Sequence, residues 1–289
     1  MRPLFRSLSE RLHGAQSLDP LGKKLRSAIY AVVPNGTARK DMLAGTWLGH
    51  PVHPLLTDVV VGAWTGAMLL DLGGGEAVED ATDALIGIGA LAAVPTAVTG
   101  LVDWSDHDDE QGRVGLVHAA LNTAALLMYS VSLGLRRSGH RGAGKALSLS
   151  AFATASASAY LGGHMAYGQG LGVNQTAFEA GVSEWKPVMA REKLPEGEPA
   201  VAEVDGTSIL LYRRGEDLLA ISNRCSHRGC PLSDGDIDER ASSVTCPCHG
   251  STFHLETGQV LHGPATAPQP AYEARFRRSK VEVRLRPGV

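Results

Sequence analysis

Charged side chains are spread unevenly along the chain and leave long apolar runs in its first 180 residues. No charged residue occurs at 84–102, 114–135 or 146–178, and Asp58 alone interrupts 42–70. A helix of about 20 residues crosses a hydrocarbon core roughly 30 Å thick. The runs therefore predict an all-α bundle of four transmembrane helices at about 54–72, 83–102, 114–135 and 146–164. The alternative, a soluble alanine-rich bundle, would show charged helix faces, which these runs lack.

The pattern changes after about residue 179, where short alternating or apolar runs replace the long ones. These runs predict strands at about 199–204, 207–213, 216–222, 242–246, 271–277 and 280–285. A hairpin turn is expected at Arg214 and Gly215. The chain is thus predicted to be multidomain, with a basic N-terminal tail (1–45), a four-helix transmembrane domain (46–167), a linker (168–185) and an all-β domain (186–289).

The first 40 residues lack the long apolar run of a secretory signal. Their basic residues are interleaved with Leu and Phe: Arg2, Arg6, Arg11, Lys23, Lys24 and Arg26. This pattern is typical of an amphipathic segment on a membrane surface. It is equally typical of a solvated, partly disordered tail, so two interpretations stay open here.

Five of the 11 histidines fall at one end of the predicted bundle. An even number of spans returns the chain to its starting side, called side A, and the span ends place His50, His53, His107, His118 and His164 at or near that side. Ionisable groups are costly inside a membrane and mark functional sites there. Imidazole is a common ligand of metals and haem.

Four of these histidines are candidate site residues: His50, His53, His118 and His164. Two of them on facing helices would supply the axial ligands of a b-type haem, and a quinone pocket with a histidine proton acceptor is a second hypothesis. The third interpretation is structural, with the imidazoles capping helices or bonding to Asp58, Asp103 and Asn122.

Overall composition hides this division of the chain. The 289 residues carry 27 Lys+Arg against 30 Asp+Glu, with a mean hydropathy of −0.04. Without a basic excess, nucleic acid is not an expected partner. Four cysteines are too few for a secreted scaffold built on disulfides, but all four lie between Cys225 and Cys248.

The cysteines belong to two short motifs that also contain histidine. The first runs Cys225-Ser-His227-Arg-Gly-Cys230, and the second Cys246-Pro-Cys248-His249-Gly-Ser251. Two cysteines and two histidines can bind zinc, but a zinc site usually draws its cysteines from one loop and its histidines from another. One cysteine and one histidine from each loop suit a two-iron cluster with thiolates on one iron and imidazoles on the other.

These motifs resemble those of a Rieske [2Fe-2S] domain, over about residues 186–287. The resemblance implies that Cys225 and Cys246 ligate one iron and that His227 and His249 ligate the other. It also implies that Cys230 and Cys248 form the disulfide seen in the Rieske proteins of cytochrome bc complexes. The segment 263–270, with Pro264, Pro268 and Pro270, resembles the proline loop that shields the cluster.

Two further positions are expected to tune the cluster. Ser251 matches a hydroxyl that, in high-potential members, hydrogen-bonds a bridging sulfide, whereas Phe253 stands where those members have a tyrosine. Hydrogen bonds to cluster sulfur raise the potential. We therefore expect a potential below those of the bc-complex proteins, yet inside the Rieske range of roughly −150 to +300 mV.

The membrane half, over about residues 50–170, resembles a four-helix membrane domain that is found fused to Rieske domains and is marked by a Gly-His-Pro-x-His-Pro motif, here residues 49–54. The fusion implies a membrane-anchored electron carrier in a quinone-linked or respiratory chain, with a quinone or proteins as electron donor and acceptor. A ferredoxin-like donor to an oxygenase and a membrane-bound redox sensor are the alternatives. The linker would place the cluster on side A, with the histidines.

Charge counts give two answers about which side of the cell membrane side A occupies. The basic N-terminal segment, with Arg39 and Lys40, favours a cytoplasmic side A. Arg136, Arg137, Arg141 and Lys145 on side B argue the reverse, and Arg136-Arg137 also matches a twin-arginine export signal. The larger count favours the cytoplasm for the Rieske domain, while a disulfide favours an oxidising compartment.

Overall fold

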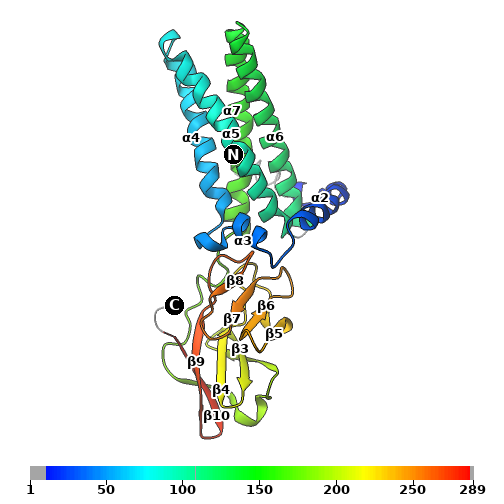
Figure 1. Ribbon diagram of the computed structural model, residues 1–289, viewed down its shortest axis with the longest axis vertical. Coiled ribbons are helices and arrows are strands. Elements are labelled where there is room, and N and C mark those ends of the chain that lie inside the picture. Colours follow the sequence, from blue (N-terminus) through cyan, green and yellow to red (C-terminus); the bar gives the residue numbers. More distant parts are fainter. Residues whose placement is uncertain (1–10, 108, 287–289) are drawn as a thin grey trace. The chain divides into compact units, whose positions relative to one another are not determined.

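A computed structural model describes residues 11–107 and 109–286 of the chain (Figure 1). The chain forms two compact units. Among the described residues, the first contains 11–32 and 52–171 without 108, and the second contains 33–51 and 172–286. The expected division at residue 45 therefore differs from the observed one, because the segment 33–51 belongs to the second unit. Each unit is described by itself.

The first unit is helical. Its α-helices are α2 (Asp19–Val32), α4 (Val52–Gly73), α5 (Glu79–Ser105), α6 (Asp109–Arg137) and α7 (Arg141–Gly163). Short helical turns are η1 (Gln16–Leu18), η3 (Glu76–Val78) and the π-helical η4 (His164–Gly168). The four predicted spans thus coincide with α4 to α7, which run alongside one another in Figure 1.

Among the described residues, three helical segments are long and apolar enough to cross a membrane. They are Val52–Gly73, Glu76–Ser105 and Asp109–Arg137, with mean hydropathies of 1.5, 2.0 and 1.5. Large apolar side chains on these helices are exposed, among them Leu55, Leu69, Leu91, Val94 and Leu127. Lipid would cover such side chains. The fourth predicted span forms helix α7, but this Ala/Ser-rich helix is not one of the three.

A buried ionic cluster joins α4, α6 and α7 at the end of the bundle that the sequence assigns to side B. Arg136 Nη2 lies 2.5 Å from Asp71 Oδ2, and their side chains are 2% and 6% exposed. Ser148 Oγ donates to the same Asp71 oxygen at 2.7 Å. Arg136 is therefore buried and paired in the core of the bundle and is not a loop charge. It should not be counted among the positive loop charges of side B, and the twin-arginine interpretation is weakened.

The N-terminal segment is largely helical from residue 16 onward, so a disordered tail is wrong for the described part. Helix α2 is fixed to the bundle by ion pairs of Arg26 with Asp109 and of Asp19 with Arg113. The hydroxyl of Tyr30 donates to Asp106 Oδ1 at 3.0 Å. Burial and the adjacent Asp106 carboxylate raise the pKa of Tyr30. Arg2 and Arg6 lie outside the described residues.

The second unit contains two antiparallel sheets. The larger has the strand order β1-β10-β9-β4-β3-β2, and the smaller has the order β5-β6-β7-β8. The strands are β1 (Lys186–Ala190), β2 (Pro199–Val204), β3 (Thr207–Arg214), β4 (Asp217–Ser222), β5 (Asp236–Asp238), β6 (Ser243–Thr245), β7 (Thr252–His254), β8 (Val260–His262), β9 (Ala271–Arg277) and β10 (Lys280–Leu285). Single-turn helices η5 (Arg191–Lys193) and η6 (Leu232–Asp234) lie between strands. All six predicted strands are present, and β1, β5, β7 and β8 were not predicted.

Strand β3 is buried on both faces, which explains its unbroken apolar run. Side chains alternate between the two faces of a sheet. Leu210 and Tyr212 therefore enter one core, which also contains Cys225 and Cys246. Ile209 and Leu211 enter the other core, between the large sheet and the segments that cover its opposite face. The first core includes residues of both sheets together with Cys225 and Cys246, and so it positions the two cysteine-bearing loops.

The segment 33–51 adds a short helix, α3 (Ala38–Ala44), and the turn η2 (Thr46–Leu48) to the second unit. Thr37 caps α3 by accepting a hydrogen bond from the Lys40 amide, and Gly45 ends the helix in the left-handed conformation. These are ordinary signals of a short helix.

Candidate functional site

The two cysteine–histidine motifs fold into loops of the same geometry. In the first loop the Gly229 amide donates to Cys225 O at 2.7 Å, and in the second the Gly250 amide donates to Cys246 O at 3.0 Å. Both glycines have φ near +75°, a conformation that other residues rarely adopt. The amide of the first cysteine in each loop donates to a carbonyl oxygen five residues later. Cys225 N donates to Cys230 O and Cys246 N donates to Ser251 O, both at 2.8 Å.

This geometry turns backbone amides toward the cysteine sulfurs. The amides of His227 and Arg228 bond to Cys225, and those of Cys248 and His249 bond to Cys246. Amide donors stabilise a thiolate and are the usual environment of sulfur that holds a metal or cluster. The Gly and Pro content of the motifs is the sequence signal for these tight turns.

The two loops bring like side chains together. The buried thiols of Cys225 and Cys246 are in hydrogen-bond contact, which raises the pKa of Cys225 and lowers that of Cys246. The imidazoles of His227 and His249 lie 5.1 Å apart between ring centroids, at 86° to one another. The thiols are buried while both imidazoles are partly exposed. A thiol pair inside and an imidazole pair outside is the donor set that a Rieske-type [2Fe-2S] cluster requires.

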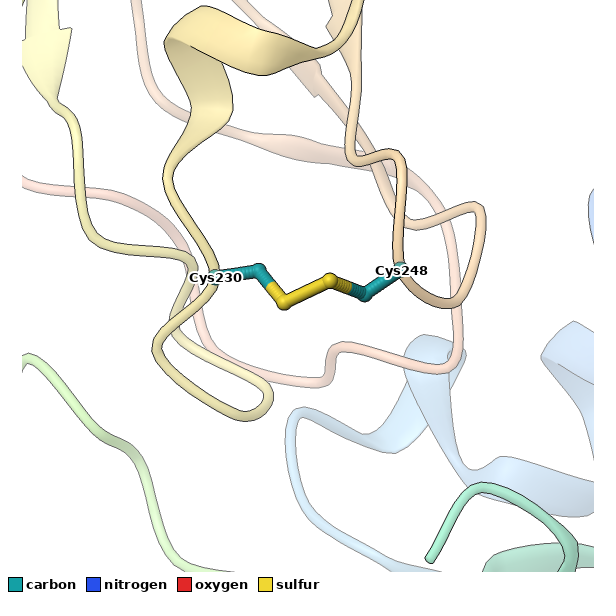
Figure 2. Close-up of a disulfide and its surroundings, with 2 residues drawn as sticks. All are labelled: Cys230 and Cys248. Carbon is teal, nitrogen blue, oxygen red and sulfur yellow. A yellow bond between two sulfur atoms is a disulfide. The ribbon is translucent and has the colours of Figure 1, made fainter. Parts of the chain in front are cut away.

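A disulfide between Cys230 and Cys248 ties the two loops together (Figure 2). Their Cα atoms are 6.5 Å apart, and 18 positions separate them in the sequence. The sulfur of Cys246 lies within 4.8 Å of both disulfide sulfurs. This pairing was implied by the family resemblance alone, and the structure confirms it.

Both loops also hold the proline segment 263–270. Ser226 Oγ, in the first loop, donates to Ala267 O at 2.7 Å. Ser251 Oγ, in the second, accepts the Ala265 amide at 2.9 Å. Both serines are buried, Ser251 completely. The ring of Phe253 is also fully buried and belongs to the core that contains the two thiols. The proline segment is therefore part of the loop cluster.

Helix α3 contributes contacts to this region that the sequence did not predict. Asp41 Oδ1 accepts the Gly263 amide at 2.7 Å, and Asp41 Oδ2 lies 3.0 Å from His262 Nδ1. Thr46 Oγ1 donates to Ala265 O at 3.3 Å. Asn35 packs against Gly250 of the second loop. The helix itself was recognisable from its cap residues, but no local signal indicated where it would pack.

The candidate histidines of the membrane half do not all come together. His50 precedes α4, is exposed, and lies with its Nδ1 3.1 Å from Pro51 O, so it shares no helix face with His53. The ring of His164 lies 6.0 Å from that of His13. His107 Nδ1 lies 3.0 Å from Trp104 O, within its own turn. His53 and His118 remain as two histidines held between helices of the bundle.

Comparisons with known proteins agree with the division into two parts. Residues 184–273 match the Rieske [2Fe-2S] domain family, and residues 49–175 match a predicted membrane protein family, DUF2231. The ferredoxin subunit of anthranilate 1,2-dioxygenase from Burkholderia cepacia is 33% identical over 107 residues, which cover 37% of this chain and 97% of that protein.

Two further similarities concern the same type of domain. The cytochrome b6-f complex iron-sulfur subunit of Chlorobaculum thiosulfatiphilum is 31% identical over 84 residues, which cover 29% of this chain and 44% of that protein. Among solved structures, the ferredoxin of carbazole 1,9a-dioxygenase from Nocardioides aromaticivorans IC177 is 29% identical with a TM-score of 0.34. That match covers 36% of this chain and 100% of the ferredoxin.

Proposed function

We propose that this chain, which belongs to the Rieske [2Fe-2S] family and also carries a DUF2231 membrane domain, is a membrane-anchored one-electron carrier that takes its electrons from a quinol. The observation that carries the proposal is the pair of matched cysteine–histidine loops joined by the Cys230–Cys248 disulfide, in a chain with three apolar helices of spanning length. We further propose that α7 crosses the membrane as a fourth span, shielded by its packing against α6.

The proposed ligands are Cys225 and Cys246 for one iron and His227 and His249 for the other. A bound [2Fe-2S] cluster supplies a one-electron redox couple. The chain's own residues set the conditions for it. Buried cysteines keep water from the sulfur side, and the partly exposed imidazoles form the edge that a redox partner can reach. Ser226 and Ser251 hold the proline segment against both loops.

The alternative is a ferredoxin-like donor to an oxygenase. The observation that favours it is the 33% identity to the ferredoxin subunit of anthranilate 1,2-dioxygenase over nearly its whole length. The disulfide and the membrane domain favour the quinol-linked carrier, because the ferredoxins that serve oxygenases generally lack both. A redox sensor without electron throughput is the third candidate.

The test uses the full chain, purified in mild detergent and reconstituted into vesicles. Electron paramagnetic resonance after dithionite reduction should show a cluster with mixed sulfur and nitrogen ligation. Loss of that signal in Cys225→Ser or His249→Ala, with retention in the matched control His262→Ala, would support the ligand set. A wild-type protein loaded with iron but lacking this signal would contradict it.

Anaerobic mixing with a reduced short-chain quinol then separates the functions. Rapid bleaching of the cluster absorbance by the quinol supports the proposal. Reduction by a pyridine-nucleotide-dependent reductase alone, followed by transfer to an oxygenase, supports the ferredoxin alternative. A cluster that neither system reduces at a useful rate supports a sensor. The last two results both overturn the quinol-linked carrier.

A further inference from the structure

The four long helices of the first unit form two hairpins with the same pattern of buried positions. Helices α4 and α5 form the first hairpin, and α6 and α7 form the second. Val52-His53 and Leu56 in α4 correspond to Val117-His118 and Leu121 in α6, 65 positions later. Between α5 and α7 the offset is 62 positions, which aligns Gly100 with Gly162.

Burial follows the same two offsets. The buried positions of α4 at 60, 64, 67 and 71 correspond to buried positions of α6 at 125, 129, 132 and 136. Those of α5 at 82, 86, 89, 96 and 99 correspond to those of α7 at 144, 148, 151, 158 and 161. The two hairpins therefore turn the same faces inward, although none of these nine pairs is identical in residue type.

Equivalent residues of the two copies also contact each other. Asp71 pairs with its equivalent Arg136 at 2.5 Å. The ring of Trp64 stacks on that of its equivalent Tyr129, with centroids 4.2 Å apart and planes at 22°. Contact between a residue and its own copy is the mark of a two-fold axis. Here the axis is approximate and runs along the bundle between α4 and α6.

His53 and His118 are the third equivalent pair on this axis. They precede Trp64 and Tyr129 by 11 residues, which is close to three helical turns and therefore the same helix face. His53 Nδ1 lies 2.9 Å from Thr96 O, and His118 Nδ1 lies 2.8 Å from the equivalent Ser158 O.

Each ring also lies against an equivalent glycine, four residues after the carbonyl that it contacts. A Cβ at Gly100 would come within 2.7 Å of His53 Cε1, and a Cβ at Gly162 within 3.2 Å of His118 Cε1. A side chain at either position would displace the imidazole. The carbonyl and the glycine together fix the orientation of each ring, once in each hairpin.

The hydrogen bonds also define which nitrogen is available. A carbonyl oxygen only accepts, so Nδ1 of each ring carries the proton and Nε2 keeps its lone pair. Histidines that bind a metal through Nε2 characteristically donate Nδ1–H to such a carbonyl. The copies differ in one respect. Asn122 Nδ2 lies 3.0 Å from His118 Nε2, whereas Thr57, at the equivalent position, donates to His53 O.

We propose that His53 and His118 are the two axial ligands of a b-type haem bound on the pseudo-two-fold axis of the bundle. Two neutral imidazoles, each held by its own hairpin with the proton on Nδ1 and a lone pair on Nε2, form the donor set of a bis-histidine haem. Binding of this ligand would require the Asn122 amide to release His118 Nε2. The site is independent of the Rieske loops and does not rest on the proposed quinol reaction.

The test is the haem content of the full-length protein purified in detergent from haem-replete cells. The pyridine haemochrome and the reduced-minus-oxidised absorbance spectrum should show haem b in the wild type. The haem content of His53→Ala and of His118→Ala should each be at least tenfold below that of the wild type. The matched controls His50→Ala and His164→Ala remove other histidines of the same region and should retain it.

Two further measurements guard against variants that merely misfold. The paramagnetic signal of the Rieske cluster, measured on the same samples, reports whether the chain is intact. Added imidazole should restore the haem spectrum of His118→Gly by filling the vacated position. Wild-type protein without haem overturns the proposal. So does full haem content in His53→Ala or His118→Ala, or haem loss in the two controls as large as in the ligand variants.

Discussion

Ser251 allows a sharp test of how the chain sets the potential of its cluster. Its Oγ accepts the Ala265 amide at 2.9 Å, so the hydroxyl proton remains available to donate to a cluster sulfide. Ser226 in the other loop uses its proton differently, because its Oγ donates to Ala267 O at 2.7 Å. Both serines hold the proline segment, but only Ser251 keeps a proton for the cluster.

The magnitudes follow from these contacts. In Ser251→Ala the Ala265 amide is left buried without its acceptor, which costs about 1–3 kcal/mol of stability. Ser226→Ala leaves the half-buried Ala267 carbonyl without its donor and should cost a smaller amount. A hydrogen bond to a charged acceptor contributes about 1.5–3 kcal/mol. If that bond strengthens only on reduction, its loss lowers a one-electron potential by at most about 60–130 mV.

The assay is a redox titration of each purified variant, followed by the paramagnetic signal of the reduced cluster, beside thermal unfolding. We expect both variants to lose stability and only Ser251→Ala to lose potential. An equal fall of potential in both variants would refute the reasoning, because it would assign the effect to movement of the proline segment. An unchanged potential in Ser251→Ala would show that its hydroxyl does not bond to the cluster.

Four further predictions concern other residues of the second unit. Phe253→Tyr adds a hydroxyl to a fully buried ring in the core that contains the two thiols, and it should raise the potential in the same titration. No rise would contradict the assigned tuning role. Cys230→Ser opens a loop of 18 positions and should lower the free energy of unfolding by about 3 kcal/mol in denaturant titrations, with wild type plus reductant matching the variant. Asp41→Ala leaves the Gly263 amide without its acceptor and should speed hydrogen exchange of the α3 amides. Asp41→Asn keeps an acceptor oxygen, so its α3 amides should exchange more slowly than those of Asp41→Ala. Equal exchange rates in the two variants would argue against the contact. Burial raises the pKa of Glu179 above its ordinary 4.5, so the folded state keeps a proton that the unfolded chain releases. The free energy of unfolding should therefore fall as pH rises from about 4.5 through the raised pKa. In urea titrations Glu179→Gln should abolish that fall.

Features with a strong local cause were predictable from the sequence. The apolar runs predicted all four helices α4 to α7, and three of them are long and apolar enough to cross a membrane, which excludes charge over about 20 residues. The two cysteine–histidine motifs gave both loops, because their glycines impose the turns that aim backbone amides at sulfur. The ligand assignment itself stays a prediction.

Features that depend on long-range packing were not predictable. Strands β5, β7 and β8 have three residues each, too few for an alternating pattern to show, and β6, of the same length, was predicted only as part of the longer run 242–246. The contact of Asp41 with Gly263 joins positions 222 residues apart, and nothing near Asp41 specifies that partner. Arg136 was interpreted as a loop charge because its partner Asp71 lies on another helix, where the ion pair forms only after the hairpins assemble.

The sequence did not reveal the similarity of the two hairpins, because most equivalent residues differ. The physical reason for these differences also explains which equivalent residues are identical. A charged residue on a two-fold axis would face its own copy, and two like charges in an apolar bundle repel strongly. The equivalent pair at that level is therefore Asp71 with Arg136, opposite in charge and dissimilar in sequence. A neutral imidazole carries no such penalty against its copy. His53 and His118 can therefore be the same residue in both hairpins. Gly100 and Gly162, which lie against their rings, are also identical, so both hairpins place the same groups at this position on the axis.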